Sequence, residues 1–142
     1  VCRHKVQCCL QLCKNANPPN LHRDPLMLRD RLLLLKPDFM DQDQGPCYCP
    51  ACATIEGLLG FYPQLRTALD VVYLDFPRPR AAVIAEIGAE NQGLPALVLY
   101  APTSADALRD LDVREWNGRR FLKSPNDIGR YLARTKGIGE PH

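Results

Sequence analysis

Three cysteines that lie close together carry most of the chemistry that this sequence could perform. Cys49 and Cys52 are separated by Pro50 and Ala51, and Cys47 stands just before them. Two thiols at this spacing, between an apolar run and a helical pattern, are typical of thiol–disulfide exchange. Three thiolates are also ligands that a zinc ion prefers. The surrounding elements decide which kind of site is favoured.

The members of the Cys49–Cys52 pair are expected to have unequal roles. Cys49 would lie at the N-terminus of a helix, where unpaired amides and the positive end of the helix dipole stabilise a thiolate. Pro50 would fix the first helical φ angle. Cys52, one turn further along and facing partly inward, would resolve the mixed disulfide that Cys49 forms. We therefore predict Cys49 and Cys52 as the catalytic residues.

Alternating strand and helix patterns surround the pair. Apolar or β-branched runs predict strands, and apolar residues at helical spacing predict helices. The predicted strands are residues 31–36, 71–76, 96–100 and 119–122, and the predicted helices are residues 51–62, 79–88 and 124–137. Residues 38–46 are predicted to be a polar loop. Asn117-Gly118 predicts a tight turn, so that the last strand pairs with residues 113–116 or with the third strand.

This order of elements resembles the thioredoxin-like superfamily in its glutaredoxin-type form. Two features carry the resemblance: the Cys49–Cys52 motif between the first strand and the first helix, and Leu94-Pro95 just before the third strand, where that superfamily places a cis proline. The resemblance implies an α/β fold of order β-α-β-α-β-β-α, with helices on both faces of a mixed four-stranded sheet. Residues 30–142 would form this thioredoxin-like domain.

Two further stretches are similar to a bacterial family of uncharacterised thioredoxin-like domains. They are Leu35–Phe39, at the end of the first strand, and Gly139–His142, at the end of the chain. Members of that family likewise begin near the position of Met27. This second resemblance implies no particular activity.

The thioredoxin-like topology predicts where a substrate would bind. Its first, second and fourth strands run parallel and its third runs against them, so one edge of the sheet gathers the cysteines and the loops around them. The predicted substrate-binding residues are Pro50, Arg78, Arg80, Leu94, Pro95 and Ser124. A cis Pro95 would leave the backbone of Leu94 free to bind an extended substrate. The two arginines would attract carboxylates or stabilise the Cys49 thiolate.

These residues also have structural interpretations. Pro95 suits a plain turn into a strand, and the two arginines suit a solvated surface. Ser124 suits the N-cap of the last helix, together with Asp127. Ser124 also matches the position that holds the γ-glutamyl end of glutathione in glutaredoxins, although Leu122-Lys123 stands where those proteins carry a glycine pair.

Cys47 has no place in a two-cysteine mechanism and leaves alternatives open. With Cys49 and Cys52 it could hold a metal ion, with Asp41, Asp43 or an N-terminal cysteine as fourth ligand. It could instead be a spare thiol or a second resolving partner. Because no fourth ligand is obvious nearby, we predict neither a metal nor another cofactor.

Composition and charge limit the classes of partner. The chain is 46% hydrophobic and 24% charged, with a net charge of +2, which is ordinary for a soluble globular protein. The charges form no basic patch for nucleic acid, and no apolar run is long enough to span a membrane. The seven cysteines are bunched rather than spread as in a secreted disulfide framework, and no secretory signal is visible. We expect a cytoplasmic protein without nucleic-acid or membrane partners.

Residues 1–29 differ from the rest, because they are rich in cysteine, proline and basic residues and lack a sustained period. They predict a disordered extension, or upstream sequence if translation starts at Met27. The alternative is a metal site, although the usual ligand spacing is missing. Its candidate ligands are His4, Cys8, Cys9, Cys13 and His22.

The patterns together predict a thiol–disulfide oxidoreductase. Its substrate would be a protein or a low-molecular-weight thiol or disulfide, with glutathione as one candidate. The alternative is a noncatalytic thioredoxin-like binding module that uses the sheet edge near Leu94-Pro95, with cysteines that are structural or bind metal. The two functions differ in whether activity depends on Cys49.

Overall fold

Seven short strands and four helices follow one another in residues 28–142, the part of the chain that the computed structural model describes. The strands are β1 Arg31–Leu35, β2 Phe39–Asp41, β3 Gln44–Cys47, β4 Asp70–Leu74, β5 Ala96–Val98, β6 Arg114–Trp116 and β7 Arg119–Leu122. The helices are α1 Pro50–Phe61, α2 Leu65–Ala68, α3 Ala81–Ile87 and α4 Pro125–Lys136, with 3-10 turns at Ala89–Asn91 and Asp106–Leu108. None of these helices is long and apolar enough to cross a membrane.

The N-terminal predictions cannot be compared with this structure. The predicted extension lies outside the described residues, apart from Leu28 and Arg29. The start at Met27 and the metal site between His4 and His22 lie outside them as well.

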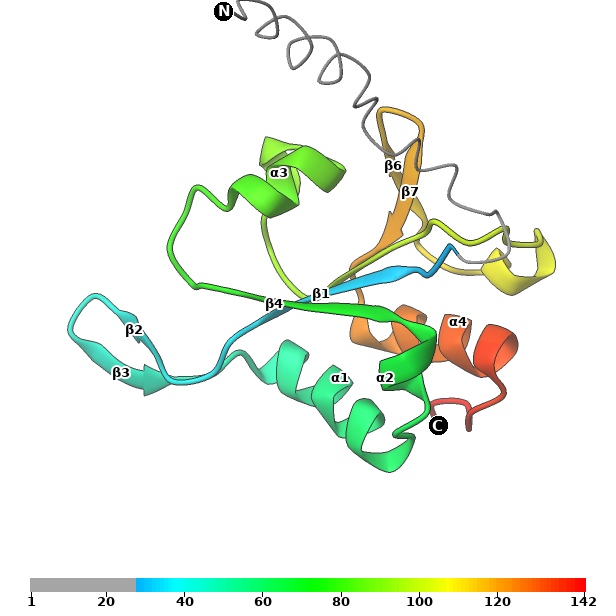
Figure 1. The fold of residues 1–142 in the computed structure, drawn as a ribbon, viewed down its shortest axis with the longest axis horizontal. Coiled ribbons are helices and arrows are strands. Elements are labelled where there is room, and N and C mark those ends of the chain that lie inside the picture. Colours follow the sequence, from blue (N-terminus) through cyan, green and yellow to red (C-terminus); the bar gives the residue numbers. More distant parts are fainter. Residues whose placement is uncertain (1–27) are drawn as a thin grey trace, which may run out of the picture.

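The main sheet has the strand order β4-β1-β5-β7-β6. β1 and β4 are parallel, β5 runs against both β1 and β7, and β6 runs against β7. The predicted directions of the four main strands, three one way and one the other, are therefore confirmed. The sheet is mixed, and its central strands β1 and β5 bring the two halves of the chain together (Figure 1).

The predicted number of four strands is wrong, because β6 adds a fifth strand at the edge of the sheet. β6 pairs with β7 through the turn at Asn117 and Gly118, whose φ angles of 49° and 75° are both positive. A two-residue turn of this kind joins antiparallel neighbours directly. The strand 119–122 therefore pairs with both candidates, β5 on one side and β6 on the other.

The predicted polar loop at residues 38–46 is also wrong, because this segment forms a separate two-stranded hairpin, β2–β3. Its register pairs Phe39 with Cys47 and Asp41 with Gln44. The Phe39 ring stacks on the Phe76 ring, with centroids 4.2 Å apart, and this contact ties the hairpin to the segment after β4. The hairpin projects from the body of the domain (Figure 1).

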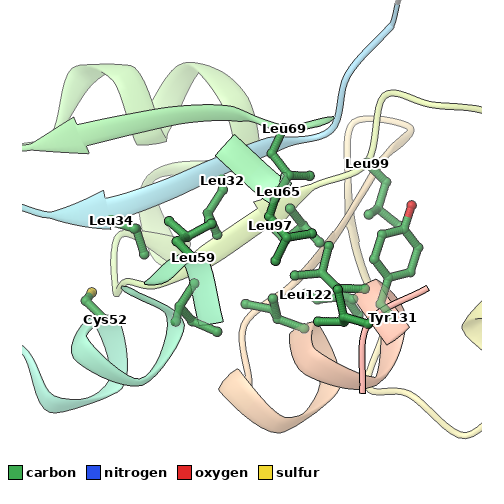
Figure 2. Packing of buried hydrophobic residues seen from close by; sticks show 14 residues of the cluster. Leu32, Leu34, Cys52, Leu59, Leu65, Leu69, Leu97, Leu99, Leu122 and Tyr131 are labelled. Carbon is green, nitrogen blue, oxygen red and sulfur yellow. The ribbon is translucent and has the colours of Figure 1, made fainter. Parts of the chain in front are cut away.

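Helices cover both faces of the main sheet, as predicted. α1, α2 and α4 lie on one face and α3 lies on the other (Figure 1). Leu32 and Leu34 of β1 pack toward α1 and α4, while Leu33 packs toward α3. This alternation follows from the two-residue period of a strand, and it explains why β1 is apolar throughout. Figure 2 shows the larger cluster, with Cys52 at its edge.

The two longest helices begin and end within one residue of the predicted bounds. Pro50 is the first residue of α1, and Tyr62 follows its end. Ser124 is the N-cap of α4, where its side chain accepts a hydrogen bond from the amide of Asp127 at 3.4 Å. Gly137 ends α4 in the left-handed conformation, which glycine adopts at little cost. The capping interpretation of Ser124 is confirmed.

Candidate dithiol site

Cys49 lies between the β2–β3 hairpin and α1, and it is the N-cap residue of α1. Its Sγ accepts a hydrogen bond from the amide of Cys52 at 3.3 Å. A helix leaves its first amides without partners, and a side-chain acceptor at the N-cap satisfies one of them. The sulfur therefore occupies the place at which a helix terminus favours negative charge.

Leu94 and Pro95 meet Cys49 from a distant part of the chain. The Leu94-Pro95 peptide bond is cis, as predicted. The Cys49 thiol donates to the carbonyl oxygen of Leu94 at 3.7 Å. Pro95 is buried directly before β5, and Leu94 is half-buried beside the sulfur. The structure thus brings together three of the residues that were predicted for the site.

Cys52 is far less accessible than Cys49. It is 5% exposed and lies at the edge of the larger core cluster (Figure 2). Burial raises the pKa of the Cys52 thiol to about 12, against the opposing effect of the Leu35 amide, which donates to its Sγ at 3.5 Å. Cys52 therefore stays protonated at neutral pH. The accessible sulfur is that of Cys49, which is half-buried.

Arg80 lies just before α3 and is buried, at 7% exposure. Its guanidinium donates to the carbonyl oxygens of Asp75 at 3.3 Å and Gln92 at 2.6 Å, and also to that of Phe76. The solvated interpretation is therefore wrong for Arg80. It holds for Arg78, which is exposed.

The charge of Arg80 reaches both cysteines. Burial lowers the pKa of Arg80, the neighbouring Arg78 lowers it further, and Cys52 and Cys49 act in the opposite direction. No carboxylate in residues 28–142 forms an ion pair with it. A buried cation normally has such a partner, because leaving water is costly. Both cysteines lie close enough for the charge of Arg80 to act on them.

Lys123 is a second cation in this region, and the sequence patterns did not predict its role. Its Nζ donates to the carbonyl oxygen of Asn91 at 2.9 Å and also to that of Gly93. Burial lowers the pKa of Lys123 to about 8, and the charges of Arg114, Arg78 and Arg80 add to this effect. Its place after β7, where glutaredoxins carry glycines, was the only signal for it.

A hollow of about 450 Å³ opens beside the two sulfurs. Leu34, Leu35 and Tyr48 supply its apolar surface, and Glu56 and Tyr73 supply its polar wall. Tyr48 is 65% exposed. Its position between Cys47 and Cys49 had suggested no role.

The polar wall of this hollow is a closed hydrogen-bonded group. The Tyr73 hydroxyl donates to Glu56 at 2.7 Å, and Arg66 donates to both Glu56 and Tyr73. Burial raises the pKa of Glu56, but the bonds from Tyr73 and Arg66 and the charge of Arg66 outweigh burial, so the pKa lies below its ordinary value. Glu56 is therefore ionised and already partnered at neutral pH.

Ser124 does not line the hollow at the sulfurs. It lines a second hollow of about 490 Å³ between α1 and α4, together with Thr54 and Leu58. The structure gives Ser124 a capping role and places it on the other side of α1 from Tyr48 and Glu56. Pro50, by contrast, lies between the two cysteines as the first residue of α1.

Cys47 lies at the end of the hairpin and is half-buried. Its thiol donates to the carbonyl oxygen of Gln44 at 3.7 Å. Within residues 28–142, no three His, Cys, Asp or Glu side chains come together as metal ligands would. A metal site formed by the three cysteines with Asp41 or Asp43 is therefore absent from this part of the structure.

The fold and the site define an α/β protein with a mixed sheet and a reduced cysteine pair at the start of a helix. Residues 29–140 match a family described as protein of unknown function (DUF3088), and the chain belongs to that family. A search of curated proteins found no match, and neither did a search of solved structures. Because membership names no activity, function has to be argued from the site.

Proposed function

We propose that this protein is a thiol–disulfide oxidoreductase with a thioredoxin-like fold. The observation that carries the proposal is the position of Cys49. Its sulfur accepts a hydrogen bond from the first turn of α1, at the Cys52 amide, and faces the Leu94 carbonyl. The directions of β1, β4, β5 and β7, with helices on both faces, support the assignment of the fold. The substrate is a protein or low-molecular-weight disulfide, with glutathione disulfide as one candidate.

The reaction has two steps. The Cys49 thiolate attacks one sulfur of the substrate disulfide, which forms a mixed disulfide and releases the other substrate sulfur as a thiolate that takes up a proton. Cys52 then loses its proton and attacks the Cys49 sulfur. The Cys49–Cys52 disulfide forms and the second substrate thiol leaves. Two electrons pass from the protein to the substrate, and a cellular thiol or dithiol reductant must restore the pair.

The unequal burial of the two cysteines supports this order of events. The half-buried Cys49 can meet a substrate, whereas Cys52 is almost completely covered. Burial also raises the pKa of Cys52, so it remains a thiol until the mixed disulfide forms next to it. The need for a thiol reductant fits the cytoplasm, which we propose as the location.

The experiment is the reduction of insulin by dithiothreitol, with and without the protein. We expect catalysis by the wild type, none by Cys49→Ser, and a trapped mixed disulfide with Cys52→Ser. The matched control is Cys47→Ser, which should keep wild-type activity because the Cys47 thiol donates to the Gln44 carbonyl of its own hairpin. Equal rates for wild type and Cys49→Ser, with no trapped partner, would remove the enzymatic proposal.

The alternative is a noncatalytic binding module. The apolar hollow beside the sulfurs, with the exposed Tyr48 at its surface, favours it. A binding partner would then be retained equally by wild type and by Cys49→Ser, and weakened by Tyr48→Ala. Loss of the partner with Cys49→Ser, through loss of a mixed disulfide, favours the oxidoreductase instead.

A further inference from the structure

Two cations bind three consecutive backbone carbonyls next to the dithiol. Arg80 donates to the Gln92 carbonyl at 2.6 Å, and Lys123 donates to the carbonyls on either side of it, those of Asn91 and Gly93. The Gln92 side chain returns a contact, since its Oε1 accepts from the Arg80 amide at 2.7 Å. Residues 91–93 are therefore clamped from two elements, the start of α3 and the end of β7.

The clamped segment leads directly to the residue that faces Cys49. Leu94 follows Gly93, and its carbonyl oxygen lies 3.7 Å from the Cys49 sulfur. A shift of residues 91–93 would therefore move this carbonyl. Positions of reacting groups matter at this scale, because a misplacement of about 1 Å can cost about 100-fold in rate.

The same two cations have no negative partner of their own. In residues 28–142, no carboxylate forms an ion pair with Arg80 or Lys123. Carbonyl dipoles satisfy their donors without cancelling their charge. Both charges act on Cys52, and that of Arg80 acts on Cys49 as well. Their net charge is thus left to act on the cysteine pair.

We propose that Arg80 and Lys123 are positioning residues of the dithiol reaction. They fix the backbone of residues 91–93 so that the Leu94 carbonyl faces the Cys49 sulfur, and Arg80 also places a positive charge near Cys49. This inference rests on the proposed function. It assigns Lys123 a role that no sequence pattern indicated.

Three variants, Arg80→Lys, Lys123→Met and Lys123→Arg, and two controls test the two cations. Arg80→Lys keeps the charge but cannot reach the same three carbonyls, whereas Lys123→Met removes a charge and keeps an apolar stem. The matched controls are Arg109→Lys and Lys136→Met. Arg109 is an exposed residue whose ion partner is 4.0 Å away, and Lys136 lies in the last turn of α4.

Two readouts report on different parts of the proposal. The first is the pH profile of alkylation by iodoacetamide, a neutral reagent, with mass spectrometry to localise the label on Cys49. This rate follows the thiolate fraction. The second is the rate of insulin reduction, which also depends on how the substrate is presented to the sulfur. Circular dichroism checks that each variant is folded.

For Lys123→Met we expect about a tenfold slower reduction of insulin, because the contacts to the carbonyls of Asn91 and Gly93 are lost. For Arg80→Lys we expect an alkylation profile close to wild type and about a tenfold slower reduction of insulin, because position is lost while charge remains. Lys123→Arg, which keeps hydrogen-bond donors at this position, should restore most of the wild-type rate of insulin reduction. Both controls should match the wild type in both readouts.

The outcomes for the inference and for the proposed function are distinct. An inactive wild type would overturn the proposed function, and the inference with it. An active wild type with Arg80→Lys and Lys123→Met indistinguishable from their controls would overturn the inference alone. If Arg80→Lys does not fold, Lys123→Met and Lys123→Arg decide. An unchanged rate of insulin reduction in Lys123→Met then overturns the inference, and a loss of rate that Lys123→Arg reverses supports it.

Discussion

Two regions at opposite ends of β1 treat charged side chains differently. At the start of β1, carboxylates accept hydrogen bonds from hydroxyls, amides and arginines. Near its end, in the described part of the chain, the side chains of Arg80 and Lys123 make polar contacts only with backbone carbonyls. Asp30, completely buried before β1, accepts from the Tyr131 hydroxyl at 2.6 Å and from the amides of Tyr100 and Ala101 at 2.8 and 2.9 Å. Within residues 28–142, Arg80 and Lys123, near the cysteines, have no such counterpart. The carboxylate of the first group is fully hydrogen-bonded, whereas the charge of the second group is not neutralised by a carboxylate in this part of the chain.

A second carboxylate strengthens the contrast. Glu86 of α3 pairs with Arg31 and with Arg119, at 2.5 Å in both cases. Both arginines also lie over the ring of Tyr100, whose hydroxyl donates to Glu86. This arrangement links α3 to β1, to β7 and to the segment after β5. A network whose donors and acceptors are all matched stabilises one structure and has nothing left for a substrate.

The largest expected effect is that of Asp30→Ala on stability. The change removes the acceptor of the buried Tyr131 hydroxyl and of two half-buried amides, so the free energy of unfolding should fall by about 3–5 kcal/mol. Urea unfolding measures it. Asp43→Ala, in the exposed tip of the hairpin, is the control and should change the free energy by less than about 0.5 kcal/mol.

The contrast between the two ends of β1 also requires that Asp30→Ala leave the thiol chemistry unchanged in the folded protein. Alkylation of Cys49 at low temperature, where the variant is folded, tests this. A large change in the pH profile of alkylation would show that the two ends are coupled. The comparison would then fail.

Glu86→Gln should have the next largest effect. It leaves the cations of Arg31 and Arg119 partly covered without their shared carboxylate, although Arg31 keeps Asp70 at 2.8 Å. Because the Glu86 side chain is only 12% exposed, we expect a loss of about 1–3 kcal/mol in urea unfolding. Asp106→Asn breaks an exposed pair with Arg109 and should cost almost nothing. Equal losses for the two variants would contradict this ranking.

A smaller effect is expected from Cys52, near the end of β1, on how the free energy of unfolding depends on pH. In the native protein burial raises the pKa of Cys52 from 9.0 to about 12. The unfolded chain loses this proton near pH 9 while the native protein keeps it, so the contribution of Cys52 is present below pH 9 and is lost as pH rises. Between pH 8 and pH 10, the stability of wild type relative to Cys52→Ala should fall by about 1 kcal/mol. Urea titrations under reducing conditions measure this difference, and a constant or rising difference would contradict it.

Lys123 should give the smallest effect, with the opposite sign. Burial lowers the pKa of Lys123 from 10.5 to about 8, so between these values the unfolded chain holds a proton that the native protein has released. Stability therefore rises with pH over this window. The stability of wild type relative to Lys123→Met should increase from pH 8 to pH 10, by a modest amount because the side chain is only half-buried. Lys136→Met should show no such trend.

The sequence predicted those parts of the fold that depend on neighbours in the chain. Ser124 and Gly137 mark the ends of α4 through local capping, and the apolar run of β1 is readable because both faces of that strand are buried. The β2–β3 hairpin was missed because its strands do not alternate and include Gly45 and Pro46, which ordinarily disfavour strands.

The sequence predicted the site residues that belong to a motif. It did not predict the residues whose partners are backbone groups from distant parts of the chain. Cys49 and Leu94 meet as expected. The burial of Arg80 was missed because its partners are carbonyls of two separate loops, and any residue supplies a carbonyl. Lys123 was missed for the same reason. Ser124 was misplaced because the two hollows lie on opposite sides of α1, and the order of elements does not resolve which side a loop faces.

The β2–β3 hairpin shares no hydrogen-bonded strand with the main sheet, yet it ends at Cys47, just before the Cys49–Cys52 pair, and its Phe39 stacks on Phe76. Its tip can therefore be lengthened, shortened or tagged without breaking a hydrogen bond of the main sheet. The protein thus offers, at Asp43, an attachment point for a fluorophore that leaves the main sheet intact.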